Sequence, residues 1–314
     1  MAEINPVLLK ELRQRFRRGK TAWLLALYLF TIGGFVLAFI YLNWQNGPGY
    51  YQPNRSLEIF ITLSVVQLFL LAFVAPGLTA SVISGERERQ TLNVLLTTRL
   101  STWSIVWSKL VSSTAFVVVL IIATLPLYSI VFLYGGIAPG QVPGVFGFYL
   151  LTMFLFASLG IVCSAFFKRT GVSALTTYGL VFALTGGTGF LAAFLTEVGR
   201  INRPETLVNP GFLNWIVEFL QQTNPVFVLL KILAAEDGIQ TGVSFGLPYW
   251  ANYTIFCLGL GLLLLFWSSR LLLPRPQGRF SRPADKHSHG DRFFHRMADK
   301  RKQETVKEGL LDRR

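Results

Sequence analysis

The chain has 314 residues, of which 52% are hydrophobic and only 14% are charged, and its mean hydropathy is +0.49. Since a soluble domain carries about 25% charged residues, this composition argues against an ordinary soluble protein and indicates one that is embedded in lipid. The formal net charge is +13, from 29 Lys and Arg against 16 Asp and Glu residues. The meaning of that charge depends on where the basic residues lie.

The first segment, residues 1–21, is predicted to hold a helix that lies on the membrane surface. Asn5 and Pro6 stand in the order that favours the start of a helix. Leucines and one phenylalanine then recur on one face, while arginines occupy the rest, which suits a helix with its basic side toward the lipid head groups. The alternative is a solvated basic extension. The residues assigned to the surface helix are Arg13, Arg15, Phe16, Arg17 and Arg18.

Six windows without a charged residue follow, each of 21 to 25 residues. A helix needs about 20 residues to cross the hydrocarbon layer, whereas the strands of a membrane barrel are about ten residues long and alternate in polarity. The sequence therefore predicts an all-α integral membrane protein with a six-span domain at residues 22–273. The predicted spans are 22–42, 59–83, 110–134, 145–167, 172–196 and 247–269.

The basic residues gather on one side of this topology. They precede the first span, lie between spans two and three, form the pair Lys168–Arg169, and fill the chain from Arg270 through the tail at residues 274–314, for 25 of the 29 in all. Because positive residues remain in the cytoplasm, we expect both termini there and the protein in the plasma (inner) membrane. The charge then reflects topology and contact with the lipid bilayer, and no nucleic-acid partner is expected.

The longest segment on the other side is the outer loop, residues 197–246. It contains one apolar stripe at helical spacing from Phe212 to Leu220, which predicts a short helix. A second short helix is predicted to start at Asn224–Pro225. Neither is long enough to span the membrane. The two helices either cover the exit of a pathway or pack at the membrane surface.

The sequence shows no motif for ion coupling, ATP binding, metal binding or catalysis. Ion-coupled carriers place ionisable residues inside their spans, but the six windows contain none. The triplet at residues 19–21 matches the end of a phosphate-binding loop, yet Gln14 stands where its first glycine is required. Cys163 and Cys257 both fall inside spans, so neither a disulfide framework nor a metal site is indicated. No catalytic motif is found, so we expect neither an enzyme nor a bound cofactor, and any ATP must be bound by a partner.

Residues 84–103 join spans two and three and are far longer than a turn requires. They open with a run of four charged residues, after which Leu92, Leu95 and Leu96 form the apolar edge of a short helix. Such a helix suits docking into a groove on another protein. A solvated loop with a few interfacial leucines is the alternative.

Taken with the surface helix, the six spans and the outer loop, this stretch resembles the membrane subunit of type-2 ATP-binding-cassette (ABC) transporters, the export-type permease family. There a charged run precedes the pattern Thr-Leu-x-x-Leu-Leu-x-Thr, which here reads Thr91-Leu92-Asn93-Val94-Leu95-Leu96-Thr97-Thr98. Two positions depart from the family, which usually has Gly in place of Gln90 and Pro in place of Arg99. The resemblance covers residues 5 to 273.

The resemblance implies a coupling helix that docks on a separate nucleotide-binding ATPase subunit and converts its closure into a tilt of the spans. It assigns the charged contacts to Glu86, Arg87, Glu88 and Arg89, and the buried side to Thr91, Leu92, Leu95 and Leu96.

The resemblance also implies a second permease subunit, identical or related, with the substrate path between the two. Glycines of spans one and five permit close helix contact, either across that interface or within one subunit: Gly33, Gly34, Gly186, Gly187 and Gly189. Two other hypotheses remain. The chain is a membrane anchor or assembly factor that recruits a soluble partner, or an intramembrane enzyme, which would need a catalytic pair that the spans lack.

Overall fold

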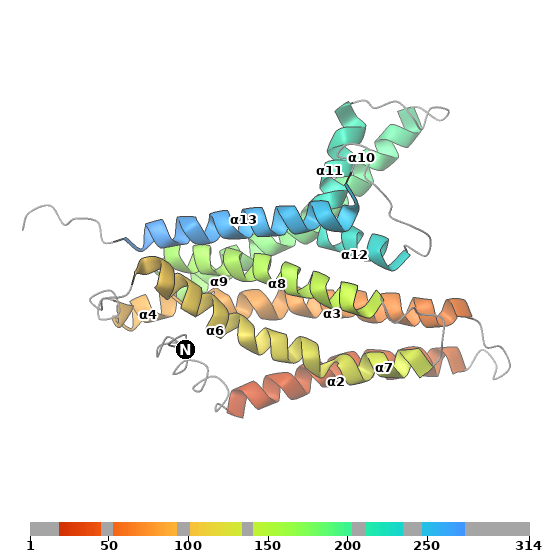
Figure 1. Cartoon of the computed structure of the whole chain (residues 1–314), viewed down its shortest axis with the longest axis horizontal. Helices are drawn as coiled ribbons and strands as arrows, with labels where there is room; N and C mark the ends of the chain where they lie inside the picture. The colour runs from red at the N-terminus through yellow and green to blue at the C-terminus, as the bar shows by residue number, and fades with distance from the viewer. Residues whose placement is uncertain are drawn as a thin grey trace, which may run out of the picture. The chain divides into compact units, whose positions relative to one another are not determined.

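The computed structural model describes residues 19–44, 53–92, 101–133, 141–202, 212–234 and 247–273. The elements within these ranges are all helices (Figure 1). The tail at residues 274–314 lies outside the described residues, as do the residues assigned to the surface helix, Arg13, Arg15, Phe16, Arg17 and Arg18.

Within the part of the chain that the structure describes, six helices are long and apolar enough to cross a membrane, which confirms the predicted all-α class with six spans. The fifth span is composite, because a π-helical turn interrupts it, and the third is broken once. In chain order the spans are α2 (Gly19–Trp44); α3 (Pro53–Thr79); α6 (Thr102–Ala123) with α7 (Leu125–Leu133); α8 (Gln141–Phe166); α9 (Thr170–Phe182) with η1 (Ala183–Gly187) and α10 (Thr188–Asn202); and α13 (Tyr249–Leu271).

Three shorter helices complete the described chain. One of them, α4 (Ser84–Glu88), follows α3, while α11 (Phe212–Thr223) and α12 (Pro225–Ala234) confirm the two short helices predicted between spans five and six. The last two meet at an angle of 84° and together are apolar enough to count as a broken span or a re-entrant pair. Figure 1 shows α10 and α11 rising from the bundle at the end opposite α4.

The fourth span, α8, lies at the centre of the bundle and packs against α3, α6, α9 and α13. Of its most apolar stretch, 72% is buried. The approach to α3 is close at Gly160, where an added Cβ would lie 2.0 Å from Thr79 Oγ1. Only glycine fits this crossing, because any side chain would displace Thr79.

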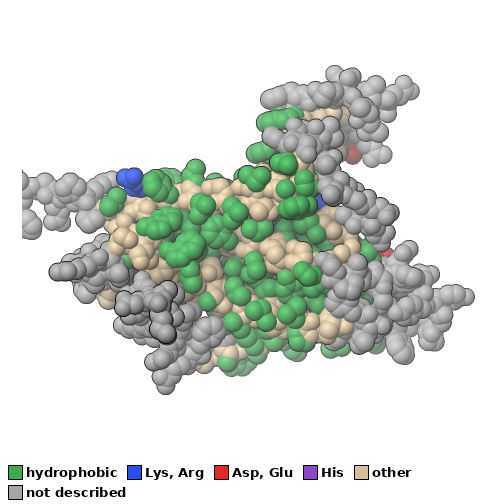
Figure 2. Space-filling model, viewed as in Figure 1, with side chains coloured by type: hydrophobic (Ala, Val, Ile, Leu, Met, Phe, Trp, Pro, Cys, Tyr) green, Lys and Arg blue, Asp and Glu red, His purple; other side chains and the backbone are tan. Residues whose placement is uncertain are grey.

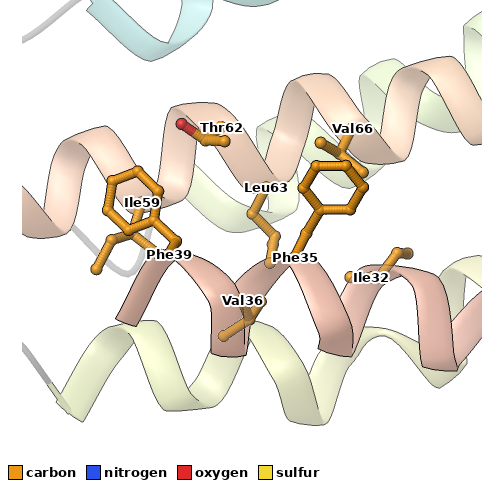
Figure 3. A pocket seen from close by; sticks show the side chains of 8 residues that line it. All are labelled: Ile32, Phe35, Val36, Phe39, Ile59, Thr62, Leu63 and Val66. Carbon is orange, nitrogen blue, oxygen red and sulfur yellow. The ribbon is translucent and has the colours of Figure 1, made fainter. Parts of the chain in front are cut away.

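The contact between α2 and α3 is almost wholly apolar (Figure 3). Ile32 and Val36 of α2 are buried against Leu63 of α3. The void that remains between the helices is about 10 Å³, room for one water at most. Hydrophobic side chains also cover much of the outside of the bundle on the face shown in Figure 2, as expected of helices that face lipid.

Several polar groups inside the bundle bond to one another. Tyr149 donates its hydroxyl to the Ser64 carbonyl at 2.9 Å, and its oxygen lies 3.1 Å from the hydroxyl of Tyr128. At the break between α6 and α7, Thr124 accepts a hydrogen bond from Gln67 Nε2 at 3.1 Å. Hydrocarbon offers no water to such groups, so these bonds let polar residues remain inside the spans.

Candidate functional site

The charged run from the sequence lies in residues 84–92, called the α4 segment below, where the ends of several spans meet. The backbone N–H groups of Ile83 and Ser84 both donate to Ser164 Oγ, each at 2.8 Å. Since Ser164 belongs to α8 and is fully buried, one hydroxyl of the central span fixes the start of α4. The segment is thus part of the packed bundle.

Arg87 binds the end of the fourth span. Its Nη2 donates to the Ala165 carbonyl at 3.0 Å, and its Nη1 donates to the Phe167 carbonyl at 3.4 Å. The last carbonyls of a helix have no partner within the helix and carry the negative end of its dipole. The half-buried guanidinium therefore caps the C-terminus of α8 from another element.

Glu88 binds the start of the fifth span. Its carboxylate accepts from the backbone N–H of Thr170 at 2.7 Å and from the Thr170 hydroxyl at 3.1 Å. Arg169, the N-cap residue of α9, is extended and makes no capping bond with its own side chain. A side-chain cap contributes about 1 kcal/mol, and a negative charge suits a helix N-terminus. Glu88 thus supplies to α9 the cap that its own sequence lacks.

Glu86 forms an ion pair with Lys109, whose Nζ donates to Glu86 Oε1. The sequence suggested that Lys109 precedes the third span, but in the structure it lies within α6 with its side chain 6% exposed, against 26% for Glu86. Lysine is rarely buried without a partner, so this pair ties the α4 segment to α6. The second carboxylate oxygen of Glu86 is buried and bonds to nothing in the described part of the chain.

The remaining residues of the segment divide between core and surface. Leu92 is 7% exposed and packs into a cluster at this end of the bundle, with Ile83, Val106, Leu110, Ala157, Ile161, Ala165, Leu265 and Leu272. Arg89 and Thr91 are exposed. Leu95 and Leu96 lie outside the described residues, so their predicted role in docking stays a prediction.

Gln90 adopts a left-handed backbone conformation, with φ at 59°. It ends α4 in a Schellman motif, in which Gln90 N–H donates to the Arg87 carbonyl at 3.1 Å and Thr91 N–H donates to the Glu86 carbonyl at 3.0 Å. Glycine takes this conformation without steric cost, whereas other residues do not. The family's usual glycine at this position therefore has a physical reason, and Gln90 takes the same turn at some cost.

A second feature is a cavity of about 650 Å³ between α3, the fifth span and α12. This volume lies within the range of about 300–1,000 Å³ typical of ligand sites. The cavity is open at one side, since four of its rings are largely exposed: Phe69, Phe73, Phe182 and Phe190. The aromatic residues on its wall are Phe69, Phe73, Tyr178, Phe182, Phe190 and Phe227.

The polar groups on this wall already have partners within the chain. Tyr178 donates its hydroxyl to the Phe73 carbonyl at 2.9 Å, and Thr185 donates to the Val181 carbonyl at 2.8 Å. Asn224 Nδ2 donates to the Thr185 carbonyl at 2.6 Å, which ties α12 to the π-helical turn. The cavity therefore offers apolar and aromatic contact rather than free hydrogen bonds.

Glycines that sequence analysis grouped together differ in the structure. A Cβ on Gly189 would lie 3.1 Å from Asn224 Nδ2, so this glycine permits close contact of the fifth span with α12 in the same chain. A Cβ on Gly33 or Gly34 would meet nothing within 4 Å. Packing within one subunit therefore accounts for Gly189 but not for the pair in α2.

The sequence pattern predicts that the charged run contacts another protein. It does not predict the contacts that the α4 segment makes with Lys109, Ser164 and Thr170 in the same chain. A signal existed for Thr170, which opens an apolar window directly after the basic pair Lys168–Arg169, where a helix N-terminus needs an acceptor. A weaker one existed for Lys109, which directly precedes the third predicted span at the far end of the same loop. Ser164 gave none, because a serine inside an apolar window has no distinguishing context.

Comparison with protein-family models gives a match to the family described as ABC-2 family transporter protein, over residues 6–269. No curated protein matches the chain.

Proposed function

Because the chain belongs to the ABC-2 family of transporter proteins, we propose that it exports a substrate with energy from ATP hydrolysed by a separate nucleotide-binding subunit. Membership makes it a transmembrane permease of an ABC transporter, a multi-pass membrane protein and a transport component rather than a catalyst. We further propose the direction of transport, the ATPase partner, its docking site and the topology of the chain.

The α4 end of the bundle faces the cytoplasm in this proposal. Arg87, Arg89, Lys109 and the pair Lys168–Arg169 all belong to segments that meet there. Arg270 lies at the same end, since its neighbour Leu272 packs against Leu92. Positive residues are retained on the cytoplasmic side, so both termini would lie there and the membrane would be the plasma membrane.

The connection of the α4 segment to three other spans is the observation that carries the coupling role. Glu86 joins it to α6, Arg87 to α8 and Glu88 to α9. A force applied to a segment held in this way reaches all three spans at once. The ATPase would contact the exposed Arg89 and Thr91 together with Leu95 and Leu96, while the three internal contacts hold the segment in place.

The cavity beside the fifth span favours an apolar or amphipathic substrate. Its wall is aromatic and its polar groups are satisfied, so binding of a strongly polar cargo would leave that cargo's groups without partners. The exposed rings of Phe182 and Phe190 would face a second permease subunit, either identical or related. The substrate path would then run between the two.

Copurification in mild detergent tests the coupling role. We expect an ATP-hydrolysing subunit to copurify with the wild type and to be lost from Arg89→Glu and from Leu95→Asp/Leu96→Asp, with membrane insertion unchanged. Arg169→Glu is the matched control, because it reverses an exposed charge at the same end of the bundle outside the docking site. If the wild type brings down only a soluble protein without ATPase activity, the anchor hypothesis replaces this one.

A further inference from the structure

We propose that Glu88 is a positioning residue that makes the α4 segment and the start of the fifth span move as one body. This inference rests on the proposed docking of an ATPase at the α4 segment. It adds the route by which that docking reaches the span that walls the cavity.

The contact itself is a helix cap supplied from outside the helix. Both carboxylate oxygens of Glu88 lie 3.1 Å from the Thr170 hydroxyl, and one of them accepts the Thr170 N–H at 2.7 Å. A Cβ on Gly85 would lie 3.7 Å from Thr170 Cγ2, so the Thr170 side chain also lies against the backbone of α4. A residue at the N-cap position would cap α9 as well, yet Arg169 stands there and makes no such bond. The cap is therefore also a tie between two elements.

Two of the three spans that the α4 segment contacts, the fourth and the fifth, differ in how firmly the bundle fixes them. The segment is bound to α8, of which 72% of the most apolar stretch is buried, and to the fifth span, for which the figure is 11%. Ser173 adds a second tie, since its hydroxyl donates to the Ala80 carbonyl at 2.6 Å. Packing within this chain resists a displacement of the fifth span less than a displacement of α8, so α9 is the element that follows the segment.

The fifth span also has a place to bend. The π-helical turn at Ala183–Gly187 follows α9 directly, and such turns weaken the regular bonding of a helix. The carbonyl of Thr185 in that turn bonds to Asn224 of the α11–α12 pair. A movement of α9 about this fixed point shifts the cavity wall on α9, which includes Tyr178 and Phe182. Glu88 thus connects ATPase docking to the shape of the cavity.

The test separates capping from transmission. Glu88→Ala removes both the cap and the tie, while Glu88→Ala/Arg169→Asn restores a cap from the chain's own N-cap position but not the tie. The readout is the distance between spin labels at Gly171→Cys on α9 and Gly259→Cys on α13, measured without nucleotide and after trapping with ATP and vanadate. A Cβ at either position meets nothing within 4 Å. The parent for labelling carries Cys163→Ala and Cys257→Ala, which replace the two native cysteines.

We expect the distance between the two labels to change in the parent complex when it is trapped with ATP and vanadate. The double variant Glu88→Ala/Arg169→Asn should show no such change, although it keeps the parent's melting temperature and its bound ATPase. Glu88→Gln, which retains an acceptor for Thr170, should keep part of the change, and Arg169→Asn alone should keep all of it. A double variant that responds like the parent would show that Glu88 is only a cap, and a parent without a distance change would equally overturn the inference. If no ATPase copurifies with the parent, the proposed function itself fails, and that outcome is read before any label distance.

Discussion

The fourth and fifth spans follow one another in the chain and have similar apolar character, yet the bundle treats them differently. Their mean hydropathies over the best stretch are 2.2 and 1.6, but 72% of the first is buried and only 11% of the second. The fourth is one continuous helix, whereas the fifth contains a π-helical turn. Apolar character alone therefore places a helix in the membrane without telling whether its neighbours are protein or lipid.

Both spans are held at the same place by one short helix. Arg87 caps the last turn of α8, and the next residue, Glu88, caps the first turn of α9 with the opposite charge. The dipoles of the two helices meet here with opposite signs, and the adjacent Arg and Glu match them. The α4 segment therefore joins a packed span to a loosely packed one, which is the arrangement a coupling element needs.

The largest effect on stability is expected from substitution of a glycine in α8, compared with the same substitution of a glycine in α9. Gly160→Ala places a Cβ 2.0 Å from Thr79 Oγ1 and 2.8 Å from Thr79 Cβ, whereas a Cβ at Gly179 in α9 meets nothing within 4 Å. We expect Gly160→Ala to lower the free energy of unfolding by about 1–3 kcal/mol, as overpacking does. Gly179→Ala should leave it unchanged or raise it slightly. Thermal unfolding in detergent measures both, and equal effects would contradict the difference in packing.

The next contrast concerns the cap on the packed span. Arg87→Ala removes two hydrogen bonds to the end of α8, and hydrogen bonds to charged groups contribute roughly 1.5–3 kcal/mol. We expect a loss near the lower end of that range, because Arg87 is only half-buried. Arg89→Ala, an exposed neighbour of the same type, should change stability by no more than about 0.5 kcal/mol. Chemical or thermal denaturation of the two variants side by side would refute this account if Arg89→Ala were the more damaging.

Much of the architecture could be predicted from the sequence, because a lipid environment demands long uncharged helices and these are visible as windows. The bend at Asn224 could be anticipated too, since Asn before Pro is a typical helix start. The division between α8 and the fifth span could not, because both read as apolar windows and the neighbours of a helix depend on tertiary packing.

The location of the candidate site could be predicted from the sequence, but its hydrogen bonds and ion pairs within the chain could not. A run of Glu and Arg predicts contacts of opposite charge, yet nothing local tells whether the partners are in another subunit or at helix ends 78 residues away, as for Arg87 and Ala165. When a residue of another element caps a helix, the only local sign is that the helix has no suitable N-cap residue of its own, as at Arg169. Gln90 was noted as a departure from the family pattern, and the structure gives the reason in its positive φ.

A smaller effect is expected where the fifth span is tied to the short helices. Asn224 accepts from the N–H groups of Val226 and Phe227, at 2.8 and 3.2 Å, and donates to the Thr185 carbonyl. Asn224→Ala should cost about 1 kcal/mol, as loss of an N-cap does, and should speed hydrogen exchange of the amides around the π-helical turn. Thr254→Ala, which removes a hydroxyl bonded to the Trp250 carbonyl within α13, is the control. Faster exchange in α8 as well would mean that the two spans are not independent.

The smallest expected change is a gain. Gln90→Gly removes the steric cost of a left-handed residue, about 1–2 kcal/mol, but glycine loses more backbone entropy on folding, about 0.5–1 kcal/mol, so the net gain should lie in the range of about 0–1.5 kcal/mol, centred below about 1 kcal/mol. Neither Arg87 nor Glu88 is touched, and the Schellman bonds to the Arg87 and Glu86 carbonyls come from backbone N–H groups that remain. The variant should therefore melt at a slightly higher temperature with ATPase binding unchanged. If it instead weakens ATPase binding, the strain at Gln90 or its exposed side chain takes part in docking, and the α4 segment would be more than a rigid link between the two spans.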